Sequence, residues 1–483
     1  MERRKIRDAF AAGKRPTLRP AYGILEKGPN CGGDCAKLGR VSALLMSEKK
    51  GFLVKNLAVL FLASLLFWSA AQADDYGFPM LDGFAATVIS TPENLRPDLR
   101  IKGRPFRLKS LTVFPDRPVK PYVWYHDKMR YLVFPQKKPA PLIFVIAGTG
   151  SSYHGPHMTT LYQAFYLAGF HVVGLPSPTS FQFMMTASTT QAPGVLDDDS
   201  RDLYRAMTMA WEQQLSQDLE VTDFYVTGYS LGGAQTGYLA MLDEQEKVFN
   251  FKKALMINPP VSLYNSAKRL DGFWRDNVRS AEEATAFWNR VMGALGEEYA
   301  NTRGAVNLGP EFLYDVYKRR RPDDKGLATL IGLVFAITAQ NMITVADVTT
   351  QSGYIVPVGT TASTAANVDP YFIVAGRTSF ENYFRDLLVP FYQRTDPSIT
   401  SEKLKYRASL KSFEDYLRTT DKVGLSHNRD DVIMADGEIE WLEGVFGDRA
   451  KIWPRGGHCG NMAYRENVEH MLAFFGASLP EGR

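Results

Sequence analysis

The chain has 483 residues, of which 45% are hydrophobic and 22% are charged, and its formal net charge is +4. Residues 1–73 hold 13 basic and 5 acidic side chains, so residues 74–483 carry a net charge of −4. The basic character belongs to the N-terminal stretch. Charge therefore gives no reason to expect a nucleic acid as a partner of the remaining chain.

This N-terminal stretch has the pattern of a secretory leader. Basic residues at 49, 50 and 55 precede an apolar run over 57–68, and Ala71-Gln72-Ala73 follows the run. The run is shorter than the roughly 20 apolar residues that span a bilayer. We expect residues 46–73 to be a signal peptide cleaved after Ala73, and the protein to be periplasmic or secreted. An uncleaved N-terminal membrane anchor is the alternative.

Residues 1–45 are rich in Arg, Lys, Gly and Pro and lack a periodic apolar pattern. We expect translation to start at Met46, which makes 1–45 a non-native extension. Cys31 and Cys35 would then be absent, and their spacing is typical of neither a redox pair nor half a zinc site. Cys459 would be the single cysteine, so no intrachain disulfide is expected, and a domain of 410 residues can bury a large core without one.

Strand-like and helix-like segments alternate beyond residue 105, which predicts an α/β fold with a mostly parallel sheet flanked by helices. The first two expected strands pair antiparallel, and the fully apolar segment 142–146 is typical of a central parallel strand. Strands are expected at 106–114, 122–134, 142–146, 171–174, 225–229, 254–258, 423–426 and 451–453. Helices are expected at 159–167, 199–215, 231–242 and 468–475.

About 165 residues separate the strand that ends at Asn258 from the strand at 423, far more than an ordinary connection needs. This stretch contains helical patterns at 281–295, 311–319, 327–342, 379–392 and 403–417. We predict a helical cap over 262–405, inserted into a core formed by 74–261 and 406–483. Its most apolar segment, 327–337, is interpreted as a buried cap helix or as a lid that lines the substrate site or touches a membrane. It is too short to span a bilayer.

An apolar, β-branched run leads into Gly228-Tyr229-Ser230-Leu231-Gly232, and a helix-compatible stretch follows to Leu242. This order of strand, tight turn and helix predicts a nucleophile elbow with Ser230 pointing out of the turn. Side chains at positions 228 and 232 would collide with neighbouring elements, so glycine leaves that space empty. A Gly-rich turn before a surface helix is the alternative interpretation.

A serine hydroxyl needs a base within hydrogen-bond reach, and the base needs an orienting carboxylate. His458 comes just after the last expected strand, among small and turn-forming residues, and is our candidate base. The acid is expected after the preceding strand, where Asp430 and Asp431 stand. We favour Asp430, because Val432 and Ile433 would then anchor its loop in the core, and Asp431 is the alternative acid.

An oxyanion that forms at the serine needs two backbone N–H donors. One is expected from Leu231, directly after the nucleophile. The other is expected from the loop that follows the 142–146 strand, where Thr149 is our candidate and Gly150 the alternative. The glycine spacing of this loop does not match a phosphate-binding loop.

These residues resemble the α/β-hydrolase superfamily over 105–260 and 405–478, in the chain order Ser, Asp, His. The elbow and the run from Gly456 to Asn461, Gly-Gly-His-Cys-Gly-Asn, carry the resemblance. Many members have His-Gly at the oxyanion loop, where this chain has Ala147-Gly148. The resemblance implies the α/β-hydrolase fold and carboxylic ester hydrolysis through an acyl-enzyme, without metal or cofactor.

The resulting hypothesis is an exported serine esterase or lipase that acts on a small or lipid-like ester and can touch a membrane through its cap. A serine peptidase is the first alternative, because both activities use the same triad and oxyanion hole. A non-catalytic binding protein that kept the fold is the second. The presence of Ser230, Asp430 and His458 argues against it.

Overall fold

The computed structural model describes residues 76–118, 127–301, 310–360 and 369–482. The predicted extension (1–45) and the predicted signal peptide (46–73) lie outside the described residues. All elements below belong to the unit that runs from Asp74 to Arg483.

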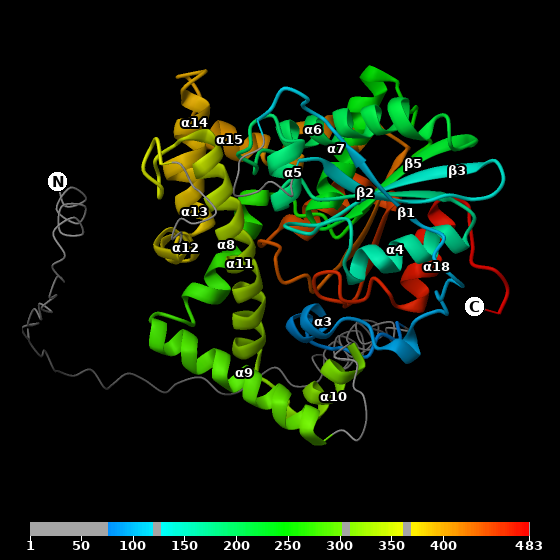
Figure 1. Cartoon of the computed structure of the whole chain (residues 1–483). Helices are drawn as coiled ribbons and strands as arrows, with labels where there is room; N and C mark the ends of the chain where they lie inside the picture. Colours follow the sequence, from blue (N-terminus) through cyan, green and yellow to red (C-terminus); the bar gives the residue numbers. More distant parts are fainter. Residues whose placement is uncertain (1–75, 119–126, 302–309, 361–368, 483) are drawn as a thin grey trace, which may run out of the picture. The chain divides into compact units, whose positions relative to one another are not determined.

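The centre of the fold is one eight-stranded sheet in the order β1-β2-β4-β3-β5-β6-β7-β8 (Figure 1). Strand β2 runs antiparallel to both of its neighbours, and the pairs from β4 to β8 are parallel. The strands are β1 (Arg107–Leu111), β2 (Met129–Phe134), β3 (Ala140–Ile146), β4 (His171–Leu175), β5 (Val221–Tyr229), β6 (Lys253–Ile257), β7 (Val423–Asn428) and β8 (Ala450–Trp453). The eight strands correspond to the expected ones, and the mostly parallel sheet confirms the predicted fold class.

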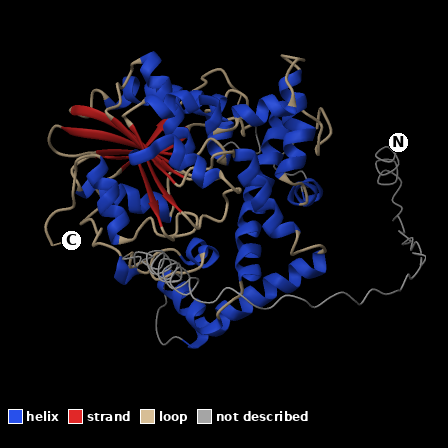
Figure 2. Cartoon of the chain, turned by 180° about the vertical axis from the view of Figure 1, so that it is seen from behind, coloured by secondary structure: helices blue, strands red, loops and turns tan. Residues whose placement is uncertain are grey.

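Helices cover both faces of the sheet, as Figure 2 shows. Alternate side chains of β3 point to opposite faces: Leu142 and Phe144 pack with α6 and α7, whereas Ile143 and Val145 pack with α4 and α18. Both faces are therefore buried, which explains the uninterrupted apolar run of this strand. The helices around the sheet are α3 (Gly83–Ile89), α4 (Pro156–Leu167), α5 (Phe181–Thr186), α6 (Leu196–Ala210), α7 (Leu231–Glu246), α16 (Glu414–Thr419), α17 (Glu438–Phe446) and α18 (Arg465–Phe474).

The described residues between β6 and β7 are mainly helical. They contain α8 (Leu263–Arg275), α9 (Ala281–Asn301), α10 (Pro310–Arg320), α11 (Asp324–Thr350), α12 (Asp369–Gly376), α13 (Phe380–Tyr383), α14 (Val389–Gln393) and α15 (Ser401–Arg407). The long helix α11 packs along α8 (Figure 1). Gly332 permits this contact, because a Cβ there would collide with the backbone of Trp274.

One predicted cap helix, 403–417, is broken in the structure. The backbone of Leu410 donates to the Val261 carbonyl, and that of Leu263 donates to the Ala408 carbonyl. Ser262 and Ser409 thus form an isolated bridge between the two ends of the insertion. The pairing with the chain before α8 takes these backbone groups out of a helix, so α15 ends at Arg407.

Candidate active site

The turn between β5 and α7 has the geometry of a nucleophile elbow. Ser230 adopts φ 55° and ψ −126°, a conformation that L-residues rarely take. A Cβ on Gly228 would collide with the Gly232 carbonyl, and a Cβ on Gly232 would collide with the Ile146 carbonyl. Both glycines are therefore required by close backbone approach, as the sequence pattern predicted.

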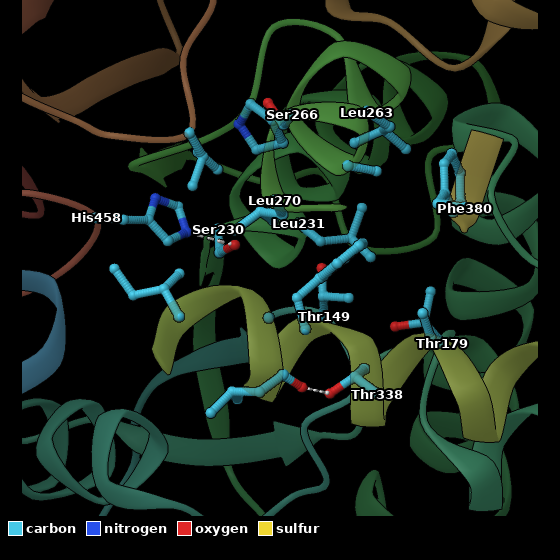
Figure 3. Close-up of a pocket in the computed structure, with 18 of the residues that line it drawn as sticks. Thr149, Thr179, Ser230, Leu231, Leu263, Ser266, Leu270, Thr338, Phe380 and His458 are labelled. Atoms are coloured by element: carbon cyan, nitrogen blue, oxygen red, sulfur yellow. Dashed lines mark hydrogen bonds between the residues drawn. The ribbon is translucent and has the colours of Figure 1, made fainter. Parts of the chain in front are cut away.

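The side chains of Ser230 and His458 meet although 228 positions separate them in the chain. His458 Nε2 lies 2.8 Å from Ser230 Oγ, and Figure 3 shows this hydrogen bond at one side of a pocket. The histidine stands in the loop after β8, which runs parallel to β7. Because the carboxyl ends of parallel strands lie at one edge of a sheet, β5 and β8 deliver the two side chains to the same place.

Asp431, not Asp430, binds the histidine, and the preferred assignment of the acid is therefore wrong by one residue. The two carboxylate oxygens of Asp431 lie 2.9 and 3.1 Å from His458 Nδ1. Asp430 instead accepts a hydrogen bond of 2.8 Å from the backbone N–H of Gly457. Val432 and Ile433 are buried as expected, but their burial does not decide which of the two neighbouring carboxylates faces the ring. The N–H of Ile433 donates to Asp431 Oδ1 over 3.2 Å and helps to hold that carboxylate toward the interior.

The carboxylate of Asp431 is fully buried and well supported. Asn258 Nδ2 donates to Oδ2 over 3.0 Å, and the ring of His427 lies 3.8 Å from the same oxygen. Burial by itself raises the pKa of Asp431, but His458, His427 and the Asn258 amide favour the charged form and bring the pKa below its ordinary value. The acid is thus held as a carboxylate that can stabilise an imidazolium at His458.

The predicted oxyanion loop lies against the elbow. A Cβ on Gly148 would stand 3.1 Å from Ser230 Cβ, so the loop after β3 passes directly beside the serine. The N–H of Gly150, the alternative oxyanion donor, donates to Thr179 Oγ1 over 2.8 Å. It is therefore already used in a hydrogen bond within the protein. Thr149 and Leu231 both line the pocket next to Ser230 (Figure 3). Leu231 is the first residue of α7, where backbone N–H groups have no partner within the helix.

A serine in a tight turn after β5, an acid after β7 and a histidine after β8, together with the strand order, are the arrangement of the α/β-hydrolase fold. The chain has the α/β-hydrolase fold.

Comparisons with known proteins give distant likenesses to α/β-hydrolases. No family model and no curated protein matches this sequence. Similar solved structures include a membrane phospholipase A described as a bacterial virulence factor, at 14% identity and a TM-score of 0.39, covering 88% of this chain and 98% of that one. An esterase of Pyrococcus furiosus is 10% identical with a TM-score of 0.37, covering 78% and 94%. Brefeldin A esterase, a bacterial homologue of human hormone-sensitive lipase, is 14% identical with a TM-score of 0.34, covering 90% and 86%.

The pocket of this α/β-hydrolase fold has a volume of about 320 Å³, and Ser230 and His458 are among the residues that line it. Much of its lining is apolar, and α8 and α11 supply a large part of it (Figure 3). The apolar lining comprises Leu263, Leu270, Ile331, Val334, Phe335, Ala339, Met342, Phe380 and Ile433. Such a wall suits an apolar substrate group placed next to a polar reaction centre.

Helix α11 therefore lines the pocket, which is one of the roles considered for its apolar segment. The whole helix has 27 residues, so the expectation that its apolar segment is too short to span a bilayer is wrong by length. By length and composition α11 could cross a membrane, and 39% of its most apolar window is buried. Contact of the cap with a membrane surface stays a prediction.

Two polar residues, His157 and Thr87, line the pocket although the sequence pattern does not indicate them. His157, at the start of α4, lines the pocket with its ring against Tyr229. Burial, His458 and Arg96 lower the pKa of His157 to about 4, so its ring is neutral near pH 7. Thr87 of α3 also lines the pocket. Neither stands in a recognisable motif, and the fold alone brings them to the serine.

Proposed function

We propose that this protein is an exported serine hydrolase that cleaves carboxylic esters through a covalent acyl-enzyme. The observation that carries the proposal is the continuous chain of hydrogen bonds from Ser230 Oγ through the His458 ring to the buried carboxylate of Asp431. Export rests on the leader pattern of residues 46–73.

In the first half of the reaction, Ser230 Oγ attacks the ester carbonyl carbon while its proton moves to His458 Nε2. Asp431 stabilises the imidazolium that results, because its carboxylate already faces Nδ1. The carbonyl oxygen becomes an oxyanion beside the N–H groups of Leu231 and Thr149. His458 then gives its proton to the leaving alcohol, and the acyl group stays on the serine.

In the second half, a water molecule loses a proton to His458 Nε2 and attacks the acyl carbon. The tetrahedral intermediate collapses to a carboxylic acid, and the proton returns from His458 to Ser230 Oγ. Every proton transfer uses the same imidazole nitrogen.

The pocket supports a substrate with an apolar acyl group of medium length. Each methylene that is buried against the apolar wall makes the binding free energy more favourable by about 0.8 kcal/mol. This gain ends when the cavity of about 320 Å³ is full. We therefore expect hydrolysis of p-nitrophenyl esters to rise from the acetate to a medium-chain ester and to fall again for the palmitate.

The test combines this ester series with a fluorophosphonate probe and a Ser230→Ala variant. The unchanged protein should hydrolyse the esters and bind the probe covalently. Ser230→Ala should lose labelling and at least about three orders of magnitude in kcat, because it removes the nucleophile. Its thermal unfolding midpoint, measured in parallel, should show that the variant is folded.

Three outcomes contradict the proposal. Residual activity above about 1% in Ser230→Ala would place the nucleophile elsewhere. Cleavage of aminoacyl-naphthylamides with no cleavage of any ester would favour a peptidase. A folded protein that neither hydrolyses esters nor reacts with the phosphonate would favour a binding function.

A further inference from the structure

The described chain begins with a segment that lies on the loop carrying His458. We call residues 76–91 the N-terminal segment and residues 454–461 the histidine loop. Arg455 Nε donates to the Phe78 carbonyl over 2.7 Å, and Asn461 Nδ2 donates to Tyr76 Oη over 2.8 Å. At the other end, Thr91 Oγ1 donates to the Gly460 carbonyl over 2.8 Å. Hydrogen bonds near both ends of the N-terminal segment thus join it to the histidine loop.

The middle of this contact reaches the backbone of the histidine itself. The N–H of His458 donates to Thr87 Oγ1 over 2.8 Å, and the same hydroxyl donates to the Gly83 carbonyl over 2.6 Å. The single proton of the Thr87 hydroxyl is therefore used in the hydrogen bond within α3, and one oxygen lone pair accepts the hydrogen bond from the His458 N–H. Although Thr87 borders the pocket, its hydroxyl has no proton left to donate to a substrate.

A second side chain binds the backbone N–H of Gly457, the residue before His458. The N–H of Gly457 donates to Asp430 Oδ1 over 2.8 Å. Gly457 has a φ of 56°, and a Cβ at this position would collide with the Gly83 carbonyl. Two consecutive N–H groups are thus fixed by side chains from two separate segments, and α3 occupies the space that a larger residue would need.

We propose that Thr87 is a positioning residue for His458, and that the N-terminal segment completes the active site by holding the histidine loop at the serine. This inference rests on the proposed serine hydrolase function. His458 must face Ser230 and Asp431 together, at 2.8 and 2.9 Å, and its backbone N–H is the anchor nearest to the ring. Loss of that anchor lets the ring leave the reactive geometry, for which small displacements reduce rates strongly.

The experiment compares Thr87→Val, Thr87→Ser and a matched control, Thr344→Val. Thr344 is also a half-buried helical threonine whose hydroxyl donates to the carbonyl four residues earlier, but it lies in α11 and, among the described residues, has no hydrogen bond with the histidine loop. Three quantities are measured for each variant: kcat and KM on the best ester, the second-order rate of phosphonate labelling at Ser230, and the thermal unfolding midpoint.

Thr87→Val should lower kcat and the labelling rate about tenfold, because the His458 N–H loses its acceptor, while KM changes less than twofold. Thr87→Ser should restore both rates to within about twofold, and Thr344→Val should leave them unchanged. If Thr87→Val unfolds, Thr87→Ala removes the same hydroxyl without adding a methyl group and is measured instead.

Equal labelling rates for the unchanged protein and Thr87→Val would overturn the inference, and so would a rise in KM with kcat unchanged. The labelling rate depends on Ser230 and His458 and not on which ester is cleaved. A protein that reacts with the phosphonate but hydrolyses no ester would therefore contradict only the proposed substrate. A protein that does not react at all would overturn the proposed function and this inference with it.

Discussion

Asp430 and Asp431 are neighbours in the chain with different tasks at the site. The carboxylate of Asp431 faces the histidine ring and is fully buried. The carboxylate of Asp430 faces the backbone of the histidine loop, and burial raises its pKa although the N–H groups of Gly457 and Gly456 oppose the shift. One residue acts on the imidazole and the other on the loop that carries it.

Substitution of these two aspartates should separate the tasks. Asp431→Asn should lower kcat by about three to four orders of magnitude with little change in KM, because the imidazolium loses its counter-charge in the transition state. Asp430→Asn keeps an acceptor for the Gly457 N–H and should cost less than about tenfold. Steady-state kinetics on one ester measures both, and a more severe loss in Asp430→Asn than in Asp431→Asn would contradict the geometry.

At the scale of elements, α11 forms one wall of the pocket. Ala339 is a small buried residue of this helix that lines the cavity, whereas Ala336, one turn earlier, does not line it. The position of Ala339 therefore limits how much of the acyl chain of the proposed substrate would fit.

Ala339→Leu should shorten the preferred acyl chain, because the added side chain fills part of a cavity of about 320 Å³. The ratio of kcat/KM for a medium-chain ester to that for the acetate should fall at least about tenfold. Ala336→Leu is the matched control and should leave the ratio within about twofold. An unchanged ratio in Ala339→Leu would mean that the acyl group does not occupy this cavity.

Within the cap, α8 and α13 are joined by a buried carboxylate. Asp271 Oδ2 accepts a hydrogen bond of 2.7 Å from the N–H of Phe380, the first residue of α13. Burial raises the pKa of Asp271 to about 6, although the N–H groups of Phe380 and Glu381 and the Arg275 charge favour the charged form. The folded protein therefore binds this proton more tightly than the unfolded chain does.

The free energy of unfolding should consequently fall, through this group, as the pH rises from about 4 to about 6. Asp271→Asn keeps the acceptor without the charge, so it should be more stable than the unchanged protein at pH 7.5, by about 1–3 kcal/mol, and equally stable near pH 4. Thermal unfolding at both pH values measures the difference. Asp276→Asn, at the exposed end of the same helix, should change stability by less than about 0.5 kcal/mol. A destabilised Asp271→Asn at pH 7.5 would contradict the prediction.

At the scale of the whole molecule, the N-terminal segment of the active site begins a few residues after the predicted cleavage point. Cleavage after Ala73 would leave Asp74 as the new N-terminus and keep Tyr76, which bonds Asn461 in the histidine loop. Cleavage after Ala73 is therefore compatible with the proposed role of the N-terminal segment.

Mass spectrometry of the exported protein should give a mature chain that starts at Asp74, since Ala71-Gln72-Ala73 is a small-residue cleavage motif. Replacement of Ala73 by Arg is the matched control and should block processing and leave a longer product. Detection of residues 1–45 in the mature chain would contradict both the start at Met46 and the signal peptide.

Most strands and helices, and the pairing of Ser230 with His458, could be predicted from the sequence. Period-two and fully apolar runs predict strands such as 142–146 because side-chain direction in a strand depends only on local backbone geometry. Gly228 has a local reason, because a Cβ there would collide with the Gly232 carbonyl within the same turn, whereas Gly232 avoids a collision with Ile146 of the neighbouring strand β3. Ser230 and His458 were therefore identified without a structure.

Which aspartate binds His458, and which segment contacts the histidine loop, follow from long-range contacts that the sequence does not reveal. The choice of Asp431 depends on the contacts of its carboxylate with His458 and with Asn258, which lies 173 positions away in the chain. The role of Thr87 depends on a contact between residues 371 positions apart. The break at Arg407 likewise depends on pairing with residues 261–263. Such contacts are made by folding the whole chain, and no local pattern encodes them.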